Sequence, residues 1–170
     1  MFRKVSAVAL LALALVLGGC DLRVRADASQ AIARFLKAVH EDDRAAFEAA
    51  IDRPALRSDL RDQLVDLGRA NSVEVDGGPS EFALDRMISP EAFRLVEAKT
   101  GRALPTTPNA AEVAVLMKVR DRTHVCLGDP RNDRCLLSFT RKKGVWRLVG
   151  MPATNLRIEV PPATGSARKR

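Results

Sequence analysis

The sequence predicts an α+β fold in which N-terminal helices pack on a C-terminal antiparallel sheet of three to four strands. Between residues 27 and 67, apolar residues recur at intervals of three and four, which is the period of a helix. After residue 112 the interval changes to two, which is typical of half-buried strands. Helices that precede strands, instead of alternating with them, favour α+β over a parallel α/β sheet.

Two helices are expected between residues 27 and 51. The first begins at Asp27 and Gln30, which resemble a capping box. Its apolar face consists of Ile32, Phe35, Leu36 and Val39. Asp42 or Asp43 is placed to cap the second, short helix, which turns Phe47 toward the core.

A third helix is expected after Pro54, because proline suits the first turn, and it should end near Gly68. Its apolar stripe consists of Leu56, Leu60, Leu64 and Leu67. Residues 71–80 are polar and rich in glycine, so they predict a loop. Residues 89–91 (SPE) predict the start of a fourth helix that ends before Gly101.

The strands are expected in the last third of the chain. Residues 113–120 show a period of two, and residues 135–140 and 145–149 have strand-like composition. The last two are expected to form a hairpin, with Gly144 at a turn position that needs positive φ. Residues 156–160 (LRIEV) predict an edge strand, because two prolines follow and stop it.

The N-terminus predicts export. Arg3 and Lys4 give a basic start, an apolar run follows over residues 7–17, and two glycines lead into Cys20. This order is typical of a secretory signal peptide. The apolar run is shorter than the about 20 residues that a membrane-spanning helix needs. If Cys20 is not lipidated, the alternatives are an ordinary signal peptide with an incidental cysteine and an uncleaved N-terminal anchor.

The segment Leu17-Gly18-Gly19-Cys20 resembles the lipobox of bacterial lipoproteins. The resemblance implies cleavage between Gly19 and Cys20 and acylation of Cys20, so that lipid holds the domain on a membrane. Asp21 resembles the signal that retains enterobacterial lipoproteins in the inner membrane. We therefore expect a lipid-anchored protein on the periplasmic face of the cell membrane, with the inner membrane favoured over the outer.

The chain is then expected to divide into four parts. Residues 1–19 form the signal peptide, 20–26 a tether, 27–160 one α+β domain, and 161–170 a basic, flexible tail. A domain of this size can bury a substantial core. The tail, which ends in SARKR, is either a solvated end or a segment that rests on anionic lipid headgroups.

Cys126 and Cys135 remain as an even pair once Cys20 is acylated. They flank a polar loop between strand-like segments, and the periplasm is oxidising, so we expect a disulfide. The alternative is a metal site built from His124, Cys126, Asp129, Asp133 and Cys135. No paired C-x-x-C or H-x-x-x-H spacing supports that alternative, so no metal or cofactor is expected.

Three stretches resemble the bacterial family called domain of unknown function 2939. They read DDRAAFEAAIDRPALRSDLRDQL, DRMISPEAFRLV and KKGVWRLVGM, and together span most of residues 29–151. Arg53 stands where the family has an aromatic residue before Pro54. The resemblance implies an exported, membrane-associated α+β domain with a tryptophan, Trp146, in its final strand; we expect Trp146 to be mostly buried. It supplies no activity and no catalytic residues.

The motifs point to no enzyme. There is no G-x-S-x-G, no glycine-rich phosphate loop, and the acids of residues 40–43 (HEDD) are placed to cap helices. Nucleic acid is not expected as a partner, because the chain has no Tyr and its 28 basic residues are interspersed with 21 acidic ones.

We therefore expect a non-catalytic role in binding an envelope protein or a small apolar ligand. Helices packed on a curved antiparallel sheet can enclose an apolar pocket, as in cone-shaped, nuclear-transport-factor-like folds, a comparison that rests on element order alone. The alternative is an enzyme whose site is assembled from residues too scattered to recognise in one sequence.

Overall fold

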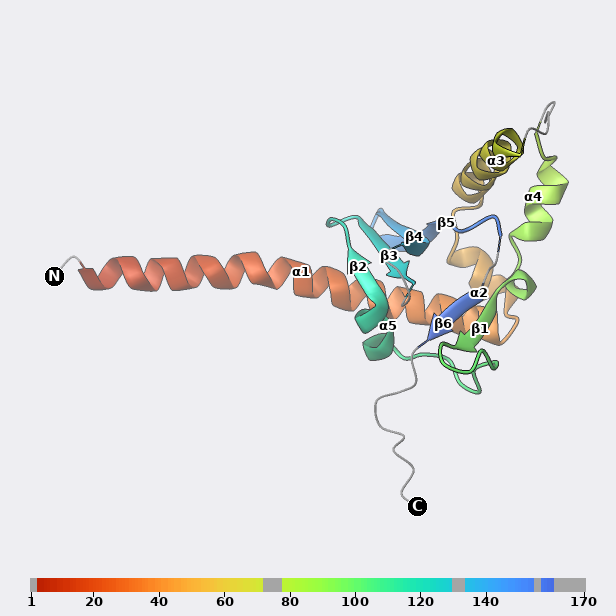
Figure 1. The fold of residues 1–170 in the computed structure, drawn as a ribbon. Coiled ribbons are helices and arrows are strands. Elements are labelled where there is room, and N and C mark those ends of the chain that lie inside the picture. The colour runs from red at the N-terminus through yellow and green to blue at the C-terminus, as the bar shows by residue number, and fades with distance from the viewer. Residues whose placement is uncertain (1–2, 72–77, 130–133, 155–156, 161–170) are drawn as a thin grey trace, which may run out of the picture.

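A computed structural model describes residues 3–71, 78–129, 134–154 and 157–160, with side chains described from Leu22 onward. Most helices lie in the N-terminal half, and all strands in the described part of the chain lie in the C-terminal half, as Figure 1 shows. The helices are α1 (Arg3–His40), α2 (Arg44–Ala49), α3 (Arg53–Ala70), α4 (Glu81–Met87), the 3₁₀ helix η1 (Pro90–Ala92) and α5 (Ala110–Leu116). The strands are β1 (Arg94–Glu97), β2 (Met117–Val119), β3 (His124–Gly128), β4 (Cys135–Lys142), β5 (Val145–Gly150) and β6 (Arg157–Val160).

The strands form two separate sheets. The larger sheet has the order β2-β3-β4-β5, and every neighbouring pair in it is antiparallel. This confirms the predicted α+β class. The expected last strand exists as β6, but it is not an edge of that sheet: β6 pairs in parallel with β1, with Leu95 opposite Ile158. A parallel partner so distant in sequence leaves no local pattern from which to predict it.

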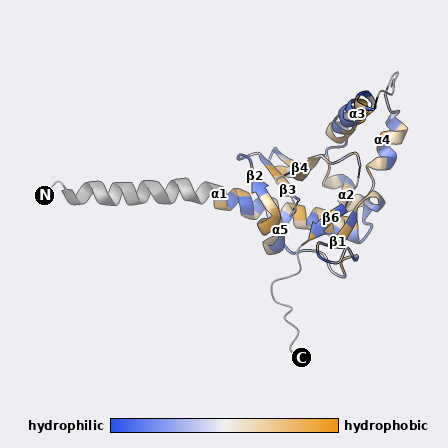
Figure 2. Cartoon of the chain, viewed as in Figure 1, coloured by the Kyte–Doolittle hydropathy of each residue, from blue (hydrophilic) through white to orange (hydrophobic). Residues whose placement is uncertain are grey.

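The core is centred on Phe35 of α1. Its ring lies 5.7 Å from that of Phe47 on α2, 5.5 Å from Phe93 beside β1, and 5.6 Å from Phe139 on β4, measured between ring centroids. The predicted α1 face is confirmed, because Ile32, Phe35, Leu36 and Val39 are all buried. Figure 2 shows hydrophobic and hydrophilic residues alternating along α3 and along the coloured part of α1, as this packing requires.

Helix α1 begins before the position that the capping pair predicted. Asp27 lies inside the helix and not at its start, and residues 22–26 are helical in continuation with it. Val24 and Ala28 are buried in the core. Packing against the domain therefore begins within the segment expected to be a tether, while the division of the chain into domains stays a prediction.

Helices α2 and α3 begin at aspartate caps. The Asp43 carboxylate accepts a hydrogen bond from the Ala46 amide at 3.0 Å, which confirms one of the two predicted caps. Asp52 caps α3 in the same way, with Pro54 in the first turn. The leucine stripe of α3 is buried only in its first half: Leu56 and Leu60 are buried, but Leu67 is 43% exposed. The helix continues past Gly68.

The predicted fourth helix is wrong. Ser89, Pro90 and Glu91 start only the single 3₁₀ turn η1, and the chain then extends into β1. The next α-helix after α3 is α4, which begins earlier, where the Ser80 hydroxyl accepts from the Ala83 amide at 3.2 Å. The consecutive buried residues Leu95 and Val96 suit a strand covered on both faces better than one face of a helix.

The strand predicted over residues 113–120 is wrong in its first half. Asn109 and Glu112 form a capping box that starts α5, and only Met117–Val119 is a strand. Val113 and Met117, four residues apart, are buried, whereas Val115 is 82% exposed. The alternation of side chains over residues 113–120 therefore did not decide the structure, because the capping box at Asn109 starts a helix just before it.

The hairpin prediction is confirmed. Lys143 and Gly144 connect β4 to β5 with φ of 50° and 79°, as a two-residue hairpin turn requires. Trp146 is 5% exposed and Leu148 fully buried, on the same face of β5. The Trp146 indole N–H donates to Asp27 Oδ2 at 3.3 Å, which joins the hairpin to α1.

Candidate functional site

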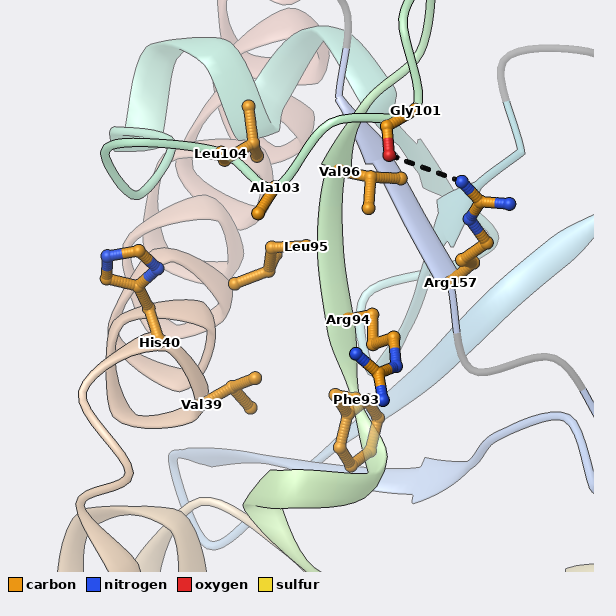
Figure 3. A pocket seen from close by; sticks show the side chains of 10 residues that line it. All are labelled: Val39, His40, Phe93, Arg94, Leu95, Val96, Gly101, Ala103, Leu104 and Arg157. Atoms are coloured by element: carbon orange, nitrogen blue, oxygen red, sulfur yellow. Dashed lines mark hydrogen bonds between the residues drawn. The ribbon is translucent and has the colours of Figure 1, made fainter.

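A pocket of about 510 Å³ lies between the end of α1, β1 and residues 101–104 (Figure 3). Val39 of α1 and Leu95 of β1 point toward each other across it, and Leu104 closes one end. Arg94 and His40 stand at its rim and are exposed. The Arg157 guanidinium donates to the Gly101 carbonyl at 3.3 Å, which holds the adjacent loop against β6.

This pocket combines a covered apolar floor with a cationic rim. The floor residues Val39, Phe93 and Leu95 keep only 6–8% of their surface exposed. A ligand seated here would therefore bury little additional apolar area, and its affinity would depend on polar contacts at the rim. The geometry suits a shallow contact more than the enclosure of an apolar molecule.

A second pocket, of about 590 Å³, lies where α1 meets the turn between β2 and β3. Arg23 and Asp27 of α1, Arg122 of the turn and Arg141 of β4 line it. Among the described residues that line it, Asp27 alone is acidic, and it contacts the Arg141 guanidinium at 3.1 Å. The pocket is therefore strongly cationic, and its chemistry suits an anionic group.

The predicted disulfide is present. Cys126 on β3 and Cys135 on β4 are bonded, with Cα atoms 5.6 Å apart, within the range that a disulfide needs. The two strands pair with a register shift between Leu127 and Gly128, next to the bond. The bond closes the loop at one end of the sheet.

Among the described residues of the alternative metal set, His124 pairs with Asp121, which is not part of that set. The His124 Nδ1 lies 2.9 Å from Asp121 Oδ2, and Asp121 Oδ1 accepts hydrogen bonds from the Thr123 amide and hydroxyl. The hydrogen bond from the Thr123 amide is the main cause that lowers the pKa of Asp121 to about 2, and His124 adds to it. Asp133 lies outside the described residues. Within the described ranges, no group of three or more His, Cys, Asp or Glu side chains is placed to hold a metal ion.

Ion pairs join α3 to α4, a feature that the sequence analysis missed. Arg57 bonds both carboxylate oxygens of Asp85, at 2.8 and 2.6 Å, and Arg53 reaches Asp85 at 3.0 Å. The hydrogen bond from Arg57 is the main cause that holds the Asp85 pKa below its ordinary value. Arg57 and Arg61 also pair with Glu81. Arg53, Arg57 and Arg61 are spaced four residues apart, so they lie on one side of α3, and this spacing in the sequence could have indicated a basic helix face that pairs with acidic residues.

Gly19 and Cys20 lie within α1, in the part for which only the backbone is described. Cleavage and lipidation there stay predictions. Among the described residues, no helix has both the length and the apolar character needed to cross a membrane.

No curated protein and no solved structure matches the chain significantly. A family model does match part of it, over α1 from residue 23 through α2, α3 and α4 to β1. The hairpin KKGVWRLVGM, which also carried the resemblance, lies outside the matched part. Residues 23–96 are thus similar to the family described as "Protein of unknown function (DUF2939)", as the helical motifs of the sequence predicted.

Proposed function

We propose that this protein is a bacterial lipoprotein, anchored through Cys20 on the periplasmic face of the cell membrane, whose domain has a non-catalytic role at the envelope. The observation that carries the proposal is the order of the first twenty residues: a basic start, a short apolar run, and Gly18-Gly19-Cys20. Asp21 favours the inner membrane.

The closed disulfide supports the same compartment. Cys126 and Cys135 are bonded within the described part of the chain. Disulfides persist in the periplasm and are rare in the cytosol. An exported domain therefore accounts for both features, with one cysteine used for the anchor and two for the bond.

The pockets favour a surface contact over a small apolar ligand. The apolar floor beside β1 is already more than nine-tenths covered. In the described part of the chain, the carboxyl groups with a shifted pKa (Asp52, Asp59, Asp85, Glu91 and Asp121) do not line that pocket, whereas an enzyme site there would be expected to use one. We infer that the partner is a component of the envelope.

Replacement of Cys20 tests the anchor. Cells that express the wild-type chain are grown with radiolabelled palmitate, and the protein is followed through membrane and soluble fractions. We expect label and membrane association for the wild type, and neither label nor stable association for Cys20→Ala, because the thiol that carries the lipid is gone.

The matched control replaces both other cysteines, Cys126→Ser with Cys135→Ser. This variant should keep the label, which shows that Cys20 is the acylated thiol. An unlabelled wild-type protein, or a label that survives in Cys20→Ala, would contradict the proposal.

A further inference from the structure

We propose that one end of the larger sheet is a docking surface for an anionic phospholipid leaflet, the same leaflet that the lipid on Cys20 enters. We call this end the basic tip and define it by Arg23, Arg122, Arg141 and Lys143. The inference rests on the proposed anchor and deepens it. The domain would lie against the membrane in a fixed orientation, whereas an anchor alone would leave it tethered but free to rotate.

The sheet topology brings these residues together. In an antiparallel sheet of order β2-β3-β4-β5, the β2–β3 and β4–β5 turns lie at the same end. The Arg141 amide donates to the Thr123 carbonyl at 2.7 Å, which joins the β2–β3 turn to the last residues of β4, just before the β4–β5 turn. Arg23, Arg122 and Arg141 line one pocket between α1 and these turns. Figure 1 shows the β2–β3 turn on the side where α1 leaves the domain.

The basic tip carries charge that its own carboxylates do not balance. Asp27 is occupied by Arg141 and Trp146, and Asp121 by Thr123 and His124. Among the described residues, no ion pair is made by Arg23, Arg122 or Lys143, which are all exposed. Such unpaired cations complement the negative surface potential of anionic lipid.

Exposed apolar side chains accompany the basic tip. Leu22 is 70% exposed beside Arg23, and Val145 is 48% exposed directly after the β4–β5 turn. A surface that mixes basic and apolar side chains is typical of proteins that bind the headgroup region.

Chain connectivity places the basic tip at the membrane. Arg23 follows Cys20 by three residues within α1, which is about 5 Å along a helix axis. Lipid on Cys20 would therefore hold Arg23 at headgroup depth. Helices α3 and α4 lie at the other end of the molecule in Figure 1, away from this surface.

Hydrogen exchange on vesicles tests the docking. The mature lipidated protein, which begins at Cys20, is reconstituted on vesicles of phosphatidylcholine alone and on vesicles that also contain phosphatidylglycerol, and flotation measures anchoring. We expect flotation with both. Amide exchange in residues 120–123 and 143–145 should slow by about fivefold or more only on the anionic vesicles, and high salt should remove the difference.

Charge reversal supplies the control. Arg122→Glu with Lys143→Glu should abolish the slowing on anionic vesicles without loss of flotation. The same charge change placed away from the basic tip, Arg69→Glu with Lys99→Glu, should leave the slowing intact. Thermal unfolding of both variants verifies that they fold.

The outcomes separate the two proposals. Flotation with equal exchange on both vesicles overturns the docking surface and leaves the anchor standing. Slowing that persists in Arg122→Glu with Lys143→Glu, or that occurs equally on neutral vesicles, also overturns it. A wild-type protein that floats with neither vesicle overturns the anchor, and the docking surface with it.

Discussion

Phe35 in the core and Asp85 between α3 and α4 each contact side chains from neighbouring elements, but the forces differ. Phe35 is fully buried among the rings of Phe47, Phe93 and Phe139. The Asp85 side chain is 36% exposed and is bound by Arg53 and Arg57. The core is thus stabilised by apolar burial, which salt and acid hardly change, whereas the α3–α4 contact depends on charge that solvent screens.

The largest effect should come from the aromatic core. Phe35→Ala should lower the free energy of unfolding by about 3–5 kcal/mol, because it leaves a cavity where three rings meet. Urea unfolding followed by circular dichroism measures the loss. Phe35→Leu, which keeps most of the volume, should lose much less. A loss under about 1 kcal/mol for Phe35→Ala would contradict the central position given to this ring.

The disulfide should contribute less. Reduction, or Cys126→Ser with Cys135→Ser, should lower the free energy of unfolding by about 2–3 kcal/mol, since the bond closes a short loop. The fold should persist, which the near-ultraviolet circular dichroism of Trp146 can report. Alkylation of periplasmic material under denaturing, non-reducing conditions checks the bond itself, and two alkylated thiols would rule it out.

Asp52 links the start of α3 to β4, and its replacement should lower the free energy of unfolding by less than loss of the disulfide. It accepts from the Ala55 amide at 3.3 Å and from Lys142 of β4 at 2.9 Å. Asp52→Ala should cost about 1 kcal/mol through the lost cap. Asp52→Asn keeps an acceptor for the cap and isolates the Lys142 contact. Equal stability of the wild type and Asp52→Ala in urea would show that the cap contributes nothing.

The pH dependence of Asp52 follows from its pKa, which the Lys142 hydrogen bond lowers below the ordinary 3.8. The folded state binds this proton more weakly than the unfolded chain does. The stabilisation is therefore complete above about pH 4 and is lost as the pH falls through the folded pKa. Asp52→Asn should remove that part of the acid sensitivity.

The smallest effect should come from the ion pairs of Asp85. Asp85→Asn should lower the free energy of unfolding by less than about 1 kcal/mol at low salt, and the difference should shrink at high salt. Urea titrations at two salt concentrations measure this, with Phe35→Leu as the variant whose loss should not change. A salt-independent loss at Asp85 would erase the contrast between the two regions.

The sequence predicted elements whose signals are local. Asp43 caps α2, Gly144 takes positive φ, and the helical face around Phe35 is buried, because each depends on neighbours within a few residues. The errors occurred where local signals competed. Asn109 and Glu112 mark a helix start as clearly as any pair in the chain, yet the alternation that follows favoured a strand.

The candidate sites also differ in whether they depend on local sequence or on long-range contacts. The disulfide followed from an even number of cysteines beside strand-like segments, so it could be predicted. The pocket beside β1 combines α1, β1 and residues 101–104, and the basic tip combines α1 with two turns. Such sites depend on long-range pairing, including the parallel β1–β6 contact, that no single stretch of sequence encodes.

The N-terminal peptide of the protein extracted from membranes tests the central claim most directly. Mass spectrometry should find a peptide that begins at Cys20 and carries the mass of a diacylglyceryl group, with a further acyl chain on its amino group. Residues 1–19 should be absent from it. A peptide that begins at Met1, or one that begins at Cys20 without acyl mass, would contradict the account of this protein as a lipoprotein.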